Sequence, residues 1–484
     1  MATKRDLVEA YSFSRRRLVT AFVSGAPGGR EVEPTRPGRT IVGGLALAVL
    51  LVAGAAIAGV FAPKDPEDWT KPGLIVSKET GAAYVILKES DHPVLRPVIN
   101  ITSARLILGT GAEPQPTILS QDTIDAQTIG DDIGILGAPA SLPRSSLLID
   151  DGWTACTGDH EGLRLAVSDS PQTRPVPDNG FVVESEGDSY LVAEAADGSG
   201  AYRYQLSDGG DRGDAGDVDN LLDEIGLPPR SAALDVPEQW LALFPTGGDL
   251  DWNSFAVTGF GDPVTDRGTL GIPRDARVGD VLTAGGESLL LTADGPTELS
   301  DFALAVYRHT SSPAGPLGTA PRSGNEPVEL DVDSPPRVGR PEPAYAAAHW
   351  PADSLQPTVG DHCAVLTASP DAAPLVQLAT DATGDASPAE VPADSRTVAV
   401  QAGRGAYVLS GGWGETAGGS PFVVDAKGQA YPLVGPEVAE RLGYADHPPS
   451  RVPDSWVKLF DKGVNLSVDA ALCPPDHQGG QPCD

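Results

Sequence analysis

The chain has 484 residues, with 34 Lys and Arg against 67 Asp and Glu, so its formal net charge is −33. This acidic balance argues against a nucleic-acid partner, because phosphates attract positive charge. The length is ample for a packed core and predicts two or more domains.

The first 38 residues form a basic head that contains an amphipathic helix. Its apolar and basic side chains recur at helical spacing and mark a cytosolic docking helix: Leu7, Tyr11, Arg15, Arg16, Arg17, Leu18 and Phe22. A linker rich in Pro, Gly and Arg follows the helix. Two interpretations stay open, namely a basic helix lying on anionic lipid and a docking helix for a cytosolic partner.

Residues 41–62, IVGGLALAVLLVAGAAIAGVFA, carry no charge, no amide and no proline. As a helix this run would be roughly 33 Å long, enough to cross a bilayer core of about 30 Å. We therefore assign residues 40–62 to a transmembrane helix. Its small residues form two small-xxx-small pairs that would permit close helix packing: Gly54 with Ala58, and Ala55 with Gly59.

The charges on either side of this segment predict its orientation. Eight Lys and Arg precede it against four Asp and Glu, a net charge of +4, so the rest of the chain carries −37. Positive flanks stay in the cytoplasm, which places the C-terminal region outside. A cleaved signal peptide would have a shorter apolar core, of about 7–15 residues. Pro63 directly after the segment also suits a protease poorly, so we expect an uncleaved anchor.

After Pro63 the chain reads as short strands with glycine turns and occasional helices, and it contains an imperfect internal repeat. Residues 82–109 and 420–444 each give two strands joined by a turn, followed by a helix that ends at Leu-Gly. Residues 188–227 have the same order with a longer insert, and residues 288–308 resemble a contracted copy.

A second repeated pattern supports duplication. Residues 235–250 and 451–466 share V-P-x-x-W-[LV]-x-L-F-x-x-G, which places Trp240 and Trp456 at equivalent positions of two short helices. The predicted fold is therefore a single-pass membrane protein with a cytosolic amphipathic helix and one transmembrane helix. Its extracytoplasmic α+β region would hold about four degenerate repeat modules around a central β-rich domain.

The predicted division of the chain is as follows: cytosolic helix and linker, 1–38; transmembrane helix, 40–62; repeat module 1, 63–143; first segment of the central domain, 144–180; module 2, 181–250; module 3, 251–312; linker and second segment of the central domain, 313–395; module 4 with the C-terminal tail, 396–484. The linker prediction rests on the Pro, Gly and Ser content of residues 312–343.

All four cysteines follow the apolar segment: Cys156, Cys363, Cys473 and Cys483. An even number in an oxidising compartment predicts two disulfides, with three possible pairings. Cys473 and Cys483 are close enough in sequence to close a small terminal loop. A zinc site is the competing interpretation, but the sequence has no CxxC or CxxH spacing.

Catalytic motifs are missing from the sequence, which has no G-x-x-x-x-G-K-[ST], no G-x-S-x-G and no H-E-x-x-H. Asp361, His362 and Cys363 resemble a nucleophile site, but neighbours in a strand point apart and a bridged cysteine is the favoured interpretation. The Asp-rich stretch 207–219 could hold Ca²⁺, yet it lacks the EF-hand Gly and Glu, and we favour a solvated insert. No catalytic, cofactor-binding or metal-binding residue is predicted.

The head and the first repeat resemble the EccB family, a core membrane component of the type VII (ESX) secretion system. The resemblance covers essentially the whole chain, and its most specific regions are Tyr11–Phe13, Arg15–Arg17, Val98–Asn100 and Ser103–Arg105–Leu106. It implies one membrane span and four α/β repeat modules around a central domain held by one disulfide, which maps onto Cys156 and Cys363. The Cys473–Cys483 pair lies beyond the resemblance and is supported only by spacing.

The resemblance also implies a function, which is assembly of the secretion pore with EccC, EccD, EccE and, outside, the mycosin protease. We expect a plasma-membrane scaffold that forms a homo-oligomer within the complex and binds no cofactor or nucleic acid. Contact with the cell wall is left open, and a cell-wall-binding protein independent of secretion is one alternative. The other is a nucleotide hydrolase, because some family members carry an ATPase label. This sequence offers no Walker motif to support that activity.

Overall fold

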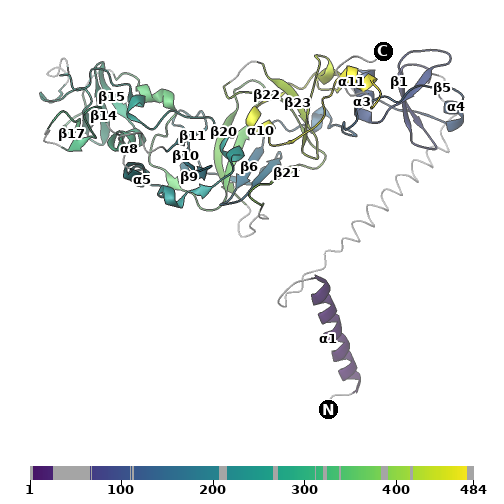
Figure 1. Ribbon diagram of the computed structural model, residues 1–484, viewed down its shortest axis with the longest axis horizontal. Helices are drawn as coiled ribbons and strands as arrows, with labels where there is room; N and C mark the ends of the chain where they lie inside the picture. The colour runs from purple at the N-terminus through teal and green to yellow at the C-terminus, as the bar shows by residue number, and fades with distance from the viewer. Residues whose placement is uncertain are drawn as a thin grey trace. The chain divides into compact units, whose positions relative to one another are not determined.

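The computed structural model describes residues 4–24, 66, 68–109, 111, 114–206, 215–264, 271–310, 312–319, 324–336, 340–382, 391–414 and 418–476. The chain divides into two compact units, Met1–Pro66 and Glu67–Asp484 (Figure 1).

The first unit contains one described helix, α1 (Lys4–Ser24). Every side chain described in it, from residue 4 to residue 19, is exposed, and Leu7, Tyr11 and Leu18 are 66%, 72% and 71% exposed. The apolar side chains described on α1 are therefore not packed in a core. The predicted transmembrane segment, residues 40–62, lies outside the described residues. Within the described ranges, no helix combines the length and the apolar character needed to cross a membrane.

The second unit begins with a sheet whose first three strands form an antiparallel meander. A strand is then added in parallel at each edge, which gives the order β4-β1-β2-β3-β5. The elements are β1 (Gly73–Ser77), β2 (Ala83–Ile86), β3 (Val94–Pro97), α3 (Ile101–Leu108), β4 (Thr117–Leu119), α4 (Gln121–Asp125) and β5 (Thr128–Ile129). Asn100 begins α3 because its side chain accepts a hydrogen bond from the Ser103 amide.

The last sheet has the same strand order and the same directions, β25-β22-β23-β24-β26. Its elements are β22 (Ala406–Gly411), β23 (Ser420–Val424), β24 (Gln429–Pro432), α9 (Val438–Arg441), β25 (Ser450–Pro453), α10 (Asp454–Val457), β26 (Asp461–Lys462) and α11 (Val468–Leu472).

Two further sheets repeat the antiparallel meander with a parallel strand beside its first strand. The second sheet, with its helices, comprises β9 (Asn179–Ser185), β10 (Asp188–Glu194), β11 (Ala201–Gln205), α5 (Ala215–Glu224), β12 (Leu234–Asp235), α6 (Glu238–Leu241) and β18 (Gln356–Pro357). The third sheet, with its helix, comprises β13 (Val281–Ala284), β14 (Glu287–Thr292), β15 (Gly295–Leu299), α8 (Asp301–His309), β16 (Gly318–Thr319) and β17 (Val328–Asp331). Short 3₁₀ helices lie in the connections between these elements: Ser145–Leu147, Arg230–Ala232, Trp252–Phe255 and Ala344–Ala348.

The expectation that residues 312–343 form only a surface linker is wrong for some of this range. Strand β17 pairs in parallel with β13, and its Val328 is 1% exposed. Strand β16 extends the same sheet beyond β17. These strands are two and four residues long and sit among Pro, Gly and Ser, so their composition hides them.

The central sheet is assembled from two distant segments of the chain, in the order β21-β7-β6-β19-β20-β8. Its strands are β6 (Trp153–Thr157), β7 (Leu163–Val167), β8 (Thr173–Pro175), β19 (His362–Thr367), β20 (Leu375–Asp381) and β21 (Arg396–Val400). Strand β21 lies in the range that the sequence assigned to module 4, yet it pairs with β7 along its whole length. Figure 1 shows this sheet between the second sheet and the last.

Three fully buried tryptophans join the central sheet to its neighbours. Trp153 belongs to β6, whereas Trp240 comes from α6 and Trp456 from α10, and all three are 0% exposed. They belong to one hydrophobic core that also includes Phe181 of β9. The three sheets therefore share a continuous core, and each of the two helices buries its tryptophan in it.

Candidate functional site

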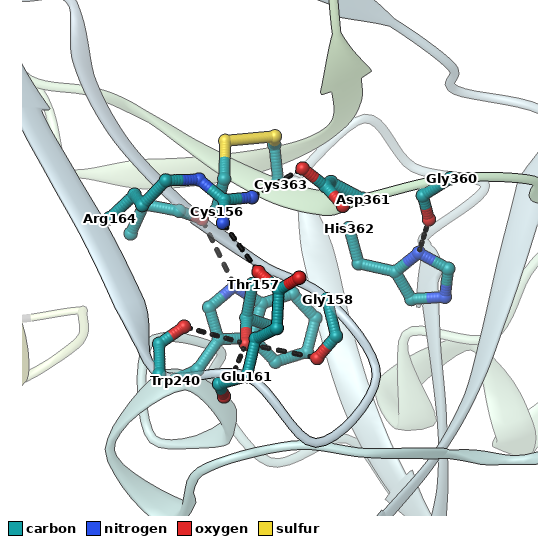
Figure 2. A network of polar contacts seen from close by, with 12 residues as sticks. Cys156, Thr157, Gly158, Glu161, Arg164, Trp240, Gly360, Asp361, His362 and Cys363 are labelled. Carbon is teal, nitrogen blue, oxygen red and sulfur yellow. Dashed lines mark hydrogen bonds and ion pairs between the residues drawn. A yellow bond between two sulfur atoms is a disulfide. The ribbon is translucent and has the colours of Figure 1, made fainter. Parts of the chain in front are cut away.

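The central sheet contains a disulfide between its two middle strands. Strands β6 and β19 are antiparallel, and their register places Cys156 directly opposite Cys363. Side chains at opposing positions lie on one face, which brings the sulfurs together although the residues are 207 positions apart. Cys156 is 7% exposed and Cys363 is fully buried. Figure 2 shows the bond between Cys156 and Cys363. In sequence, the two cysteines lie on either side of the strands of the second and third sheets.

A cation beside the disulfide holds two carboxylates. Arg164 of β7 lies opposite Cys156 in the register of the sheet. Its guanidinium donates to Glu161 at 2.7 Å and also to Asp361, and the three side chains are 15%, 22% and 22% exposed. Burial raises the pKa of Asp361, and the charge of Glu161 raises it further, whereas the charge of Arg164 lowers it. Arg164 thus neutralises acidic groups drawn from both segments of the sheet.

His362 lies next to Cys363 in sequence but belongs to the opposite face of β19. It is 2% exposed, and its ring stacks on Phe181 of β9 with centroids 4.1 Å apart. Burial lowers the pKa of His362 to about 4, and its Nδ1 lies 3.1 Å from the Gly360 carbonyl oxygen, to which it donates. Figure 2 shows the imidazole directed away from the disulfide. At neutral pH this side chain is therefore an uncharged aromatic group of the core.

The turn between β6 and β7 packs closely against the second segment of the central domain. The Thr157 hydroxyl donates to the Gly162 carbonyl at 3.1 Å. A Cβ atom at Gly162 would come within 2.1 Å of the Ser395 carbonyl oxygen, so only glycine fits this approach. On the other side, Trp240 Nε1 donates to the Ala155 carbonyl at 3.0 Å and ties α6 to β6 (Figure 2).

The chemical role of the disulfide and its neighbours is to link the two chain segments that form the central sheet. Both central thiols are consumed in a disulfide, and the neighbouring imidazole is buried and neutral. Among the described residues, no group of His, Cys, Asp and Glu is placed to hold a metal ion. A hollow beside the third sheet, lined by Phe255, Pro341 and Tyr345 among others, has a volume of about 100 Å³. Small-molecule sites usually measure about 300–1,000 Å³.

The other residues singled out from the sequence fall into two groups. Leu7, Tyr11, Arg15, Arg16, Arg17 and Leu18 lie exposed on α1, which also includes Phe22. Gly54, Ala55, Ala58, Gly59 and Cys483 lie outside the described residues. Cys473, directly after α11, is 4% exposed and disulfide-bonded. Its pairing with Cys483 stays a prediction. Of the Asp-rich stretch, residues 207–214 also lie outside the described ranges, whereas Asp219 in α5 pairs with Arg230.

Sequence reasoning missed the ion-pair network of Arg164. Some of the signal was present, because Asp361 lies two residues before a cysteine expected in a bridge. Residues two apart in a strand share one face, so a carboxylate beside the disulfide could be anticipated. The sequence could not show that Arg164 is the cation that pairs with this carboxylate, because the position of Arg164 depends on the pairing of β7 with β6.

Comparisons with known proteins agree with this architecture. The family model described as "Type VII secretion system ESX-1, transport TM domain B" matches residues 1–478. A relative from Mycolicibacterium smegmatis (strain MKD8), "ESX-1 secretion system ATPase EccB1", is 24% identical over 467 residues, covering 90% of this chain and 88% of the relative. The protein of the same name from Mycobacterium tuberculosis (strain ATCC 25618 / H37Rv) is 25% identical over 469 residues, covering 90% and 88%.

Solved structures with a similar fold come from ESX membrane complexes. A chain of an intact ESX-5 inner membrane complex matches with a TM-score of 0.59 at 20% identity, covering 100% of this chain and 98% of that one. A chain of an EccB3 dimer from the ESX-3 core complex matches with a TM-score of 0.58 at 22% identity, covering 83% and 100%. These likenesses concern the fold, and they agree with the resemblance found in the head and the first repeat.

Proposed function

Because the chain belongs to the type VII secretion family described as ESX-1 transport TM domain B, we propose that it is a structural subunit that scaffolds an ESX export complex. The observation that carries the scaffold role is the central sheet. Its strands come from two distant segments of the chain, share a core with the neighbouring sheets and are closed by a disulfide. A sheet built in this way fixes the arrangement of the neighbouring sheets, whose surfaces are then available for assembly with other subunits.

The proposal includes a topology and a set of partners. Residues 40–62 cross the plasma membrane, α1 lies in the cytoplasm, and the acidic body lies outside. The cytosolic helix docks to the motor subunit EccC, and the exported body associates with further copies of the chain or contacts the cell wall. Further partners are EccD, EccE and, outside, the mycosin protease. Four sheets with the same antiparallel meander support a body built of four repeat modules that arose by duplication.

Co-purification from detergent tests the role of the head. Full-length chain and a variant lacking residues 1–38 would be compared, with a triple Arg→Gln and a triple Arg→Lys variant at Arg15, Arg16 and Arg17. We expect the truncation and the Gln variant to lose EccC, because both remove the basic groups of α1. The Lys variant separates the two interpretations of α1, since lipid attraction needs only the charge, whereas a bidentate protein contact needs arginine. Retention of EccC by the truncated chain would refute the docking role.

The alternative of a nucleotide hydrolase rests on the names of the relatives, which contain the word ATPase. It is tested with the purified full-length protein and ATP. We expect no turnover above that of a mock preparation, because the sequence has no Walker motif and its exported region carries an excess of negative charge. ATP turnover that a single substitution abolishes would overturn the scaffold-only view.

The other alternative is a cell-wall-binding protein independent of secretion. Unchanged secretion in a strain that lacks the gene would favour this interpretation.

A further inference from the structure

The helices that follow the meanders of the first and last sheets are in contact, although they are far apart in sequence. Helix α3 contacts both α9 and α11. Each of α3 and α9 supplies an arginine near its C-terminus, Arg105 and Arg441. These side chains reach across the contact to the backbone of the other helix, so the two ends are capped reciprocally.

The hydrogen bonds of this contact use carbonyl groups that a helix cannot satisfy by itself. Arg441 Nη1 donates to the carbonyl oxygens of Leu106 at 2.9 Å and Ile107 at 3.1 Å, in the last turn of α3. Arg105 Nη2 donates to the carbonyl oxygen of Leu442, directly after α9. The last four carbonyls of a helix have no partner within it, and a charged donor strengthens such a bond. Arg105 is 4% exposed, so its charge is buried against this backbone.

Two glycines leave room for the reciprocal caps. Gly109 ends α3 with φ of 62°, and a Cβ atom there would lie 2.7 Å from Arg441 Nη1. Gly443 follows α9 with φ of 78°, and its Cβ would lie 2.3 Å from the Gly111 carbonyl oxygen. Both positions favour glycine for the left-handed backbone. At Gly443 a Cβ would also collide with the backbone of the other segment, whereas at Gly109 it would displace the Arg441 guanidinium.

The contact also closes a shared core. Leu106 of α3 belongs to the same buried cluster as Leu442, Tyr444 and Leu466 of the last sheet's region. The Tyr444 hydroxyl donates to the Pro143 carbonyl at 2.7 Å, and further along the contact the Gly134 amide donates to the Cys473 carbonyl at 3.0 Å. Apolar packing and polar contacts therefore cross between the two sheets at several points.

We propose that the first and last sheets form one folding unit closed by the reciprocal arginine caps, so that the N-terminal sheet is completed only by the C-terminal residues 406–472. The first sheet, which directly follows the predicted transmembrane segment in sequence, is then stabilised by contacts with residues 406–472. This inference stands on the contacts themselves and is independent of the proposed role in secretion.

Hydrogen exchange of the full-length chain in detergent tests the unit. In Arg441→Gln we expect amides of α3 and of β1–β3 to exchange about tenfold to a hundredfold faster, because charge-assisted bonds to α3 are lost. In Arg105→Gln we expect the same acceleration at α9 and at β22–β24. In both variants β13–β15 should exchange as in the unsubstituted chain. Faster exchange confined to the sheet that carries the substitution would overturn the proposal.

Matched controls separate the caps from general effects of substitution. Arg340→Gln removes an arginine that pairs with Glu287 and Glu298 of the third sheet, and it should leave α3 and α9 unchanged. Gly443→Ala is compared with Gly403→Ala, since Gly403 has φ of 75° but nothing within 4 Å of an added Cβ. Only Gly443→Ala should accelerate exchange in α3. Equal acceleration in the two alanine variants would contradict the role given to the close approach at Gly443. If Gly443→Ala does not fold, the exchange rates of the Arg105 and Arg441 variants test the proposal.

Discussion

His362 is buried next to the bridged Cys363, and burial lowers its pKa to about 4, so its imidazole is uncharged at neutral pH. The pKa falls because the charged imidazolium would lose its hydration in the core, and stacking on Phe181 does not replace that water. The residue next to the bridged cysteine therefore contributes packing, and it makes folding sensitive to acid.

We predict that His362→Phe reduces the acid sensitivity of folding. Below pH 6.5 the unfolded chain binds a proton at this histidine, whereas the folded chain does so only near pH 4. The free energy of unfolding therefore falls as the pH drops through this window, by up to about 3 kcal/mol. The phenylalanine variant lacks this contribution. Urea unfolding of both proteins at pH 7, 5.5 and 4.5 measures the difference, and parallel losses of stability would contradict the assignment.

We predict that Arg164→Gln destabilises the protein by about 1–3 kcal/mol at pH 7, because Glu161 and Asp361 lose their shared cation in a partly buried site. The cost should shrink as the pH falls, because burial raises the pKa of Asp361 and this carboxylate becomes protonated. The control is Arg396→Gln, whose partner Asp461 is 70% exposed. Exposed pairs contribute about 0–1 kcal/mol, so its unfolding midpoint should hardly move. Equal effects of the two substitutions would count against the network.

At the scale of elements, the spacing of apolar residues in the sequence predicted those helices and strands that bury one clearly apolar face. The turn-linked strands of residues 82–109 and 420–444 correspond to β2, β3 and α3, and to β23, β24 and α9. Strand β17 was missed and β21 was assigned to module 4, for different reasons. Strand β17 is short and lies in a Pro-rich range, whereas β21 pairs with a partner more than 200 residues away. Pairing over that distance leaves no local mark in the sequence.

The two equivalent tryptophans allow a prediction about α6 and α10. Both are fully buried, but Trp240 Nε1 donates to Ala155, whereas Trp456 Nε1 has no hydrogen-bond partner within the described ranges of the chain. Trp→Phe at either position removes similar apolar volume. Trp240→Phe should therefore lower the free energy of unfolding by about 1 kcal/mol more than Trp456→Phe. Denaturant midpoints of the two variants measure this, and the reverse order would refute the explanation.

For the whole molecule, the sequence predicted a head, a span and a body, and the family match covers residues 1–478. The span stays a prediction, because residues 40–62 lie outside the described residues. Composition carries such information because charge and apolar length are summed over many residues. The sequence could not predict that the first and last sheets share a buried cluster, since contacts between ends of a chain depend on every element in between.

We predict opposite accessibility of the two ends in intact cells. Cysteine placed at Val359, which is 90% exposed in the body, should react with a membrane-impermeant maleimide. Cysteine placed at Tyr11, which is 72% exposed on α1, should react only after permeabilisation. Both sites are exposed, so a difference reports sidedness and not burial. Labelling of both sites in intact cells would contradict the orientation derived from charge.

The position of the central disulfide has a consequence for proteolytic damage. The bond between Cys156 and Cys363 encloses 207 residue steps of the chain, including the second and third sheets up to β17. A single cut anywhere inside this loop leaves two polypeptides that remain covalently linked. A nicked molecule would keep its full mass on a non-reducing gel and separate into fragments only after reduction. Damage to the loops of these sheets would therefore not detach them from the region that precedes Cys156.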